Sequence, residues 1–321
     1  MSRPRLVVSA CLLGQAVRYD GGHRQQAFCT GLLAVYADLI PLCPELAIGL
    51  GVPRPPIQLV GDPARPRLLG VADPGRDLTD AMAALALEWA RHQGDYAGLI
   101  LKQGSPSCGL AGVKLCPSPG EPPAPVGVGL FARTLGELAP ELPLAAEDWL
   151  EEPDRRHQFL SQVFARQRWK NLLVAGATPA RLGRFHARHR YQILAHCPQA
   201  LGELEGLVRE PDGARWPLQV AAYGRLFQSA LACQVSVAAL SLAVAGLLED
   251  PVWATRRFPA RRDPGRVLGL DQASVSASLA RIRERLACRP QDPLRRQTLL
   301  FPYPLALAPA TAGSGTGPVT P

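Results

Sequence analysis

The sequence predicts an α/β fold, in which an N-terminal domain has a parallel sheet with helices on both faces and a mainly α-helical domain follows. Three observations lead to this prediction. Short apolar runs alternate with helical segments in the first half, which is typical of a parallel sheet. Helical periodicity is nearly continuous in the second half. An acidic segment at residues 145–153 separates the two patterns.

The first half contains three short apolar runs that we interpret as strands. They lie at Arg5–Ser9, Asp38–Leu42 and Gly98–Lys102. The intervening segments Ala27–Tyr36 and Ala81–Gln93 consist mainly of good helix formers. Strands that are separated by helices favour a parallel arrangement in one sheet.

The second half is predicted to be helical, and one helix start is marked clearly. Thr178 has the side chain of an N-cap, and Pro179 suits the first helical position. We assign residues 1–147 to the first domain, 153–308 to the helical domain and 309–321 to a disordered tail rich in Ala, Gly, Thr and Pro. The predicted helices are His157–Trp169, Pro179–His196, Leu218–Leu248 and Gln272–Leu286.

The composition indicates a soluble globular protein, with 47% hydrophobic and 19% charged residues. The apolar run Leu231–Leu248 is long enough to cross a membrane, but its alanines and polar residues favour a buried helix. Eight cysteines are too few for a disulfide scaffold, and the N-terminus has no signal-peptide pattern. We therefore expect a cytoplasmic protein, with no membrane partner and with reduced thiols available as metal ligands.

Charge is divided unevenly along the chain. Residues 1–150 carry 12 Lys and Arg against 14 Asp and Glu, whereas residues 151–321 carry 23 against 13. A basic second half indicates a polyanionic partner such as RNA. The alternative is a solvated, arginine-rich surface that reflects the codon usage of the genome.

Three cysteines occupy equivalent places in the predicted sheet. Cys11 follows the first strand, Cys43 the second, and Cys108 lies in the loop after the third. Because the carboxyl ends of parallel strands meet at one edge, these thiols should converge in space. A soft thiolate triad selects an iron–sulfur cluster, zinc or copper(I), and three ligands leave one position open for chemistry. The alternative is three small residues buried in tight turns.

Polar residues near these cysteines could support catalysis. Glu45 would place a carboxylate beside the metal, as a general acid or base. Ser105 offers a hydroxyl, and Lys102 a positive charge at a strand end. The alternatives for Glu45 and Lys102 are an exposed loop carboxylate and a surface cation.

Five sequence blocks occur in order over about residues 5–140. They are Val8-Ser-Ala-Cys-Leu-Leu-Gly14 with Val17-Arg-Tyr-Asp-Gly-Gly-His23, Leu42-Cys-Pro-Glu45 with Gly49 to Pro55, Gly75-Arg-Asp-Leu-Thr79, Lys102-Gln-Gly-Ser-Pro-Ser-Cys-Gly109 and Gly127-Val-Gly129. In these blocks the first half resembles the thiouracil desulfidase family. The resemblance implies that Cys11, Cys43 and Cys108 hold a 4Fe-4S cluster, with Glu45 as catalytic carboxylate and Ser105 as catalytic hydroxyl.

Residues 155–306 resemble the YbgA-type domain that is often fused behind a desulfidase domain. The segments Arg156–Phe159, Leu182–Tyr191 and Leu300–Pro304 carry this resemblance, whereas residues 249–267 depart from the usual pattern. Such fusions are similar to desulfidases that convert 4-thiouridine in tRNA to uridine. The candidate RNA-binding residues are Arg155, Arg156, Arg166, Arg168, Lys170, Arg184, Arg188 and Arg190.

The resemblance implies a non-redox, hydrolytic reaction. Water positioned by Glu45 would attack C4 of the thiolated base, and sulfur would leave as hydrosulfide. Three alternatives remain: desulfuration of free thiouracil with a regulatory C-terminal domain, a zinc hydrolase, and a non-catalytic RNA-binding or redox-sensing module. Phe185 is expected to be a core residue, and His186 and His189 to pack or hydrogen-bond instead of binding a metal.

Overall fold

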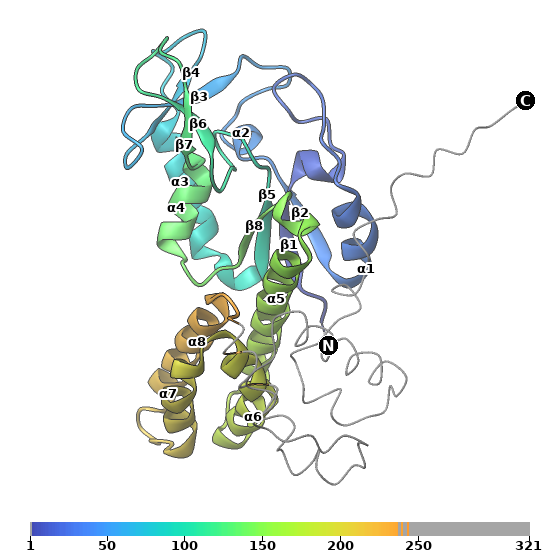
Figure 1. The fold of residues 1–321 in the computed structure, drawn as a ribbon, viewed down its shortest axis with the longest axis vertical. Helices are drawn as coiled ribbons and strands as arrows, with labels where there is room; N and C mark the ends of the chain where they lie inside the picture. Colours follow the sequence, from blue (N-terminus) through green and yellow to red (C-terminus); the bar gives the residue numbers. More distant parts are fainter. Residues whose placement is uncertain (1, 237–238, 240–242, 244–321) are drawn as a thin grey trace, which may run out of the picture. The chain divides into compact units, whose positions relative to one another are not determined.

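The computed structural model describes residues 2–236, 239 and 243 (Figure 1). These residues form two compact units, of which the first ends at Gln167 and the second begins at Arg168. The long helix α5 (Pro153–Val174) contains this division.

The central sheet of the first unit is parallel, as the sequence predicts, and has the strand order β2-β1-β5-β8. Its strands are β1 (Arg5–Ser9), β2 (Asp38–Leu42), β5 (Gly98–Leu101) and β8 (Leu144–Ala146). The first three match the predicted strands closely. The fourth is only three residues long and overlaps the start of the acidic segment that the sequence marked as a boundary.

Helices cover both faces of this sheet, which confirms the predicted architecture. In Figure 1, α3 (Thr79–Arg91) and α4 (Leu130–Leu138) lie on one side, and α1 (Ala34–Tyr36) lies on the other. The predicted helix at residues 27–36 contains a wider π-helical turn, η2 (Cys29–Leu33). The shorter helical segments are η1 (Ala10–Leu13), α2 (Pro44–Ala47), η3 (Gln93–Asp95) and η4 (Trp149–Glu151).

A second sheet, of mixed direction, was not predicted. Its strand order is β4-β3-β6-β7, with one parallel pair between β3 and β6. Each strand has only four residues, and α3 and β5 lie between β4 and β6 along the chain, so no long alternating pattern marks this sheet in the sequence. The strands are β3 (Ile57–Val60), β4 (Arg67–Gly70), β6 (Val113–Cys116) and β7 (Ala124–Gly127).

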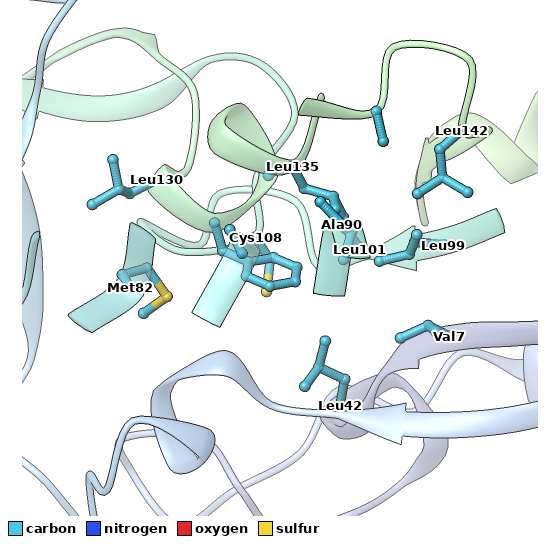
Figure 2. Packing of buried hydrophobic residues seen from close by; sticks show 14 of the residues in the cluster. Val7, Leu42, Met82, Ala90, Leu99, Leu101, Cys108, Leu130, Leu135 and Leu142 are labelled. Atoms are coloured by element: carbon cyan, nitrogen blue, oxygen red, sulfur yellow. The ribbon is translucent and has the colours of Figure 1, made fainter. Parts of the chain in front are cut away.

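The main hydrophobic core lies between the central sheet and helices α3 and α4. Leu99 and Leu101 from β5 pack with Met82 from α3 and Leu135 from α4 (Figure 2). Cys108 belongs to the same cluster, although it sits in a loop. The core therefore fixes the loop after β5, which contributes one of the three predicted ligands.

The described part of the second unit is helical. It contains the end of α5, then α6 (Pro179–His196), α7 (Pro198–Arg209) and α8 (Trp216–Ala232). The α6 bounds match the prediction, and Thr178 caps this helix by accepting a hydrogen bond from the backbone N–H of Arg181 at 3.3 Å. Helix α7 was not predicted.

The prediction of one helix over 218–248 is wrong. Helix α8 ends at Ala232, and Cys233 is extended, with φ −62° and ψ 141°. Ser236 Oγ then accepts a hydrogen bond from the N–H of Ala239 at 3.1 Å, the pattern of a new helix start. The predicted helix Gln272–Leu286 and the predicted tail 309–321 lie outside the described residues.

A cluster of aromatic side chains lies in the core of the described part of the second unit. Trp169 stacks on Tyr223 with ring centroids 5.5 Å apart, and Phe185 meets Phe227 edge to face at 5.1 Å. Phe185 is buried, which confirms its predicted place in the core. No helix in the described part of the chain is long and apolar enough to cross a membrane.

Candidate functional site

The three predicted ligand cysteines line one cavity of about 300 Å³. Cys11 lies in η1 directly after β1, Cys43 directly follows β2, and Cys108 lies in the loop after β5. Ser9 of β1 pairs with Leu42 of β2, so both strands end at the same level. The structure thus brings these cysteines together at the carboxyl edge of the sheet.

Burial favours the neutral form of all three thiols. It raises the pKa of Cys11 to about 11, and the neighbouring Cys43 adds to this effect. Burial also raises the pKa of Cys108 and that of Cys43, although the backbone N–H groups of Leu46 and Glu45 partly offset the rise at Cys43. Buried thiols of this kind become thiolates when a metal binds, because the metal replaces the proton.

The donor set fits an iron–sulfur cluster better than it fits a hard metal ion. Three soft sulfur ligands face one cavity, and none of the described cysteines is in a disulfide. No group of three or more His, Cys, Asp or Glu side chains in the described part of the chain is spaced to hold a single metal ion. Cys29 and Cys116, both buried, do not line this cavity.

Glu45 lies in the same cavity, in the first turn of α2, which starts at Pro44 with Cys43 as its N-cap. Its two carboxylate oxygens have different partners. Oε2 forms an ion pair with Arg54, while Oε1 accepts a hydrogen bond from Ser107 Oγ at 2.9 Å. Ser105 Oγ lies 3.5 Å from the same Oε1. The two predicted catalytic residues are therefore neighbours.

Ser105 is fixed by its own loop. Its Oγ accepts hydrogen bonds from the backbone N–H groups of Ser107 and Cys108, at 3.2 and 3.1 Å. Gly104 has a φ of +73°, which a residue with a side chain would rarely adopt. A Cβ at Gly129 would meet the Ser107 carbonyl oxygen at 2.6 Å, so glycine is needed where the later block packs against this loop.

Lys102 is not a surface cation. Its ammonium group pairs with Glu147 and donates to the Gln103 carbonyl oxygen at 3.0 Å. Glu147 also accepts a hydrogen bond from the Gln103 N–H at 2.6 Å. This carboxylate joins the end of β8 to the cavity wall, a role that the sequence analysis missed.

Arg54 was also missed, although it lies in a block that carried the family resemblance. Its side chain is 4% exposed and pairs with Glu45. A buried arginine in a loop generally needs a carboxylate partner, but the burial of Arg54 becomes visible only in the structure. Spacing alone could not link it to Glu45, because the two residues are nine positions apart in an irregular segment.

The predicted RNA-binding residues divide by exposure. Arg156, Arg166 and Arg168 are buried in the structure, so they are poorly placed to meet a phosphate. Arg166 donates to Gln93 Oε1 at 3.1 Å, and Arg168 Nε lies 3.1 Å from His189 Nε2. Lys170 is half-buried, and the exposed residues are Arg155, Arg184, Arg188 and Arg190.

His186 and His189 have packing and hydrogen-bonding roles, as expected. His186 Nδ1 lies 3.1 Å from the Tyr223 hydroxyl, and His189 Nδ1 lies 2.9 Å from the Phe185 carbonyl oxygen. His189 also stacks on the Phe185 ring, with centroids 4.1 Å apart.

Comparison with known proteins identifies the family of the first unit. Residues 6–147 match the family model described as 2-thiouracil desulfurase. The uncharacterized protein YbbK of Bacillus subtilis (strain 168) is 33% identical over 111 residues, which cover 32% of this chain and 72% of that protein. A solved 4Fe-4S-dependent thiouracil desulfidase, TudS, is 33% identical, with 47% of this chain and 95% of that chain covered and a TM-score of 0.38. Through residues 6–147, the chain belongs to the 2-thiouracil desulfurase family.

Proposed function

We propose that this chain is a 4Fe-4S-dependent desulfidase that removes sulfur from 4-thiouridine in tRNA. The observation that carries the proposal is the cavity itself, where the thiols of Cys11, Cys43 and Cys108 and the Glu45–Ser105 pair face the same space. Cys11, Cys43 and Cys108 would hold the cluster. The overall reaction replaces C=S by C=O with one water and releases hydrogen sulfide, so no electrons are transferred.

The residues around the cavity divide the chemistry between them. When bound, the cluster would supply an iron without a cysteine ligand, a Lewis acid for the soft thiocarbonyl sulfur. Glu45 Oε1, which lies beside the hydroxyl groups of Ser105 and Ser107, would accept a proton from the attacking water while Oε2 stays paired with Arg54. The Ser105 hydroxyl, held 3.5 Å from that oxygen, would hydrogen-bond the oxygen that forms at C4 or return the proton.

The RNA part of the proposal rests on charge. Residues 151–321 carry 23 basic against 13 acidic residues, and Arg184 and Arg188 are exposed one helical turn apart on α6. Such a face could bind phosphates while a modified base is extruded from folded tRNA into a cavity.

The test uses the full chain, reconstituted anaerobically with iron and sulfide. A brown product that absorbs near ~400 nm would identify the cluster and exclude zinc. Incubation with bulk bacterial tRNA should then lower 4-thiouridine and raise uridine, as measured by nucleoside mass spectrometry. Unchanged 4-thiouridine with an intact cluster would contradict the proposed substrate.

Matched variants separate the roles of the site. Cys108→Ser should lose the cluster, whereas Cys116→Ser, at a buried cysteine outside the cavity, should keep it. Glu45→Ala should keep the cluster and lose activity by a factor of about 100 or more, as for other general bases. Full desulfuration by Glu45→Ala would instead favour a non-catalytic module or another base.

A second candidate function is the desulfuration of free thiouracil or its nucleosides. Among the described residues, those that line the cavity all lie between Ser9 and Cys108, within the first unit. Equal kcat/KM for 4-thiouracil and for 4-thiouridine in tRNA would favour this function over the tRNA-directed one.

A further inference from the structure

Arg54 contacts three separate segments around the cavity. Its Nη2 pairs with Glu45 in α2, and its Nη1 donates to the carbonyl oxygens of Gly51 at 3.1 Å and Val17 at 3.0 Å. Its backbone N–H donates to the Tyr19 carbonyl oxygen at 2.9 Å. One buried side chain thus joins the catalytic carboxylate to the loop over residues 17–19.

That loop forms part of the cavity wall. Val17, Arg18 and Tyr19 all line the cavity. The Val17 carbonyl oxygen that accepts from Arg54 also lies 3.9 Å from Cys43 Sγ. A change in the position of Arg54 would therefore move the substrate-facing loop and Glu45 together.

The chemistry of guanidinium suits this task. Its planar fork can meet a carboxylate on one side and backbone carbonyl groups on the other, whereas an ammonium group is a point charge without fixed geometry. With Oε2 of Glu45 held by Arg54, Oε1 is directed at Ser105 and Ser107. Lysine would keep the charge at this place but could not make all of these contacts at once.

We propose that Arg54 is a positioning residue of the desulfidase, which holds Glu45 Oε1 toward Ser105 and fixes the loop over residues 17–19 against the same carboxylate. This inference rests on the proposed function for its catalytic consequence. Its structural part, that Arg54 holds Glu45 and the loop over residues 17–19, concerns this chain alone and can be measured without any cluster.

The control residue is Arg133, which makes a similar set of contacts away from the cavity. Arg133 donates to the carbonyl oxygens of Ala64 and Pro63 and lies 3.9 Å from Glu137. Arg54→Lys and Arg133→Lys therefore remove comparable contacts, and only the first is next to the site. A double variant combines Arg54→Lys with Glu45→Asp, which shortens the side chain by one methylene and so withdraws the carboxylate.

The first measurement is hydrogen exchange of the full chain without cluster, followed by mass spectrometry of its peptides. Arg54→Lys should raise the exchange rate of the peptide that contains residues 15–22 by about tenfold. This is the rise expected when one or two hydrogen bonds that hold the loop are lost. Arg133→Lys should leave that peptide unchanged. Unchanged exchange in Arg54→Lys would overturn the inference, whether or not the wild-type chain desulfurates any substrate.

The second measurement is activity of the reconstituted holoenzyme. Arg54→Lys should lower kcat by about 10- to 100-fold, with KM and iron content within twofold of the wild type, because misplacement of a catalytic group by about 1 Å has effects of this size. In the Glu45→Asp background the same substitution should cost much less, since both changes disturb one interaction. An undiminished kcat, or full additivity of the two losses, would overturn the inference. An inactive wild type with an intact cluster would count against the proposed function alone.

Discussion

Three histidines of the second unit are held neutral by burial. His186, His189 and His196 all have a pKa below the ordinary 6.5, and burial is the largest cause for each. At His189 the neighbouring Arg168 adds to the effect, and the Nδ1 contact with Phe185 opposes it. The unfolded chain therefore binds protons at these positions more readily than the folded chain does.

This difference predicts acid sensitivity of the second unit. The contribution of these histidines to stability is complete above about pH 6.5 and is lost as the pH falls through their lowered pKa values. Each can change the free energy of unfolding by up to about 1.4 kcal/mol per pH unit. Urea unfolding at pH 7.5, 6.5 and 5.5 should show this loss of stability. His189→Phe should make the slope of the unfolding free energy against pH shallower.

The control is Phe185→Leu, a non-titrating change in the same core, which should lower stability equally at each pH. An unaltered slope in His189→Phe would contradict the prediction.

The block Gly75–Thr79, which carries part of the family resemblance, lies at the start of helix α3. Asp77 Oδ1 accepts a hydrogen bond from the Thr79 N–H at 2.9 Å, and Thr79 Oγ1 accepts one from the Leu68 N–H, also at 2.9 Å. Asp77 also pairs with Arg67 of β4 at 2.7 Å. The block Gly75–Thr79 thus joins the second sheet to α3, and it has no place in the cavity.

Asp77→Asn should therefore destabilise the chain without affecting catalysis. The Thr79 hydroxyl and then Arg67 lower the pKa of Asp77 to about 2, so its contribution is present at pH 7 and is lost as the pH falls from about 4 toward 2. The side chain is 37% exposed, which limits the expected loss at pH 7 to about 1 kcal/mol. Denaturant unfolding of Asp77→Asn and the wild type at pH 7 and pH 3 measures this loss of unfolding free energy. The control is Asp62→Asn, because the Asp62 carboxylate accepts a hydrogen bond from the Ala64 N–H but has no arginine partner among the described residues. A loss of stability in Asp77→Asn that is equal at both pH values would refute the ionic part of the prediction.

The sequence predicted elements where the pattern was long or its ends were marked. Thr178 and Pro179 located the start of α6, and the apolar strands of the central sheet located the three cysteines. The four-residue strands of the second sheet have too few positions for a periodicity to appear. Arg54 and Glu147 could not be assigned because their partners are fixed by tertiary packing, which spacing along the chain does not encode.

The basic residues of the chain are concentrated in its second half, whereas the cavity is formed by residues of its first half. The residues that line the cavity lie in the first unit, while Arg184 and Arg188 lie in the second. A substrate that reaches only the cavity should be indifferent to charge on α6. A polynucleotide that contacts both should depend on it strongly, and on salt as well.

The double variant Arg184→Gln/Arg188→Gln tests this directly. If both residues contact phosphates, the KM for 4-thiouridine-containing tRNA should rise by about tenfold or more, and the slope of log affinity against log salt should become shallower by about two. The kcat/KM for free 4-thiouracil should not change. The control is Arg209→Gln/Arg215→Gln, which removes two exposed charges from the same unit that already face Glu205 and Asp212. If the control weakens tRNA binding as much, the effect belongs to net charge, and if neither variant does, α6 is not the RNA-binding surface.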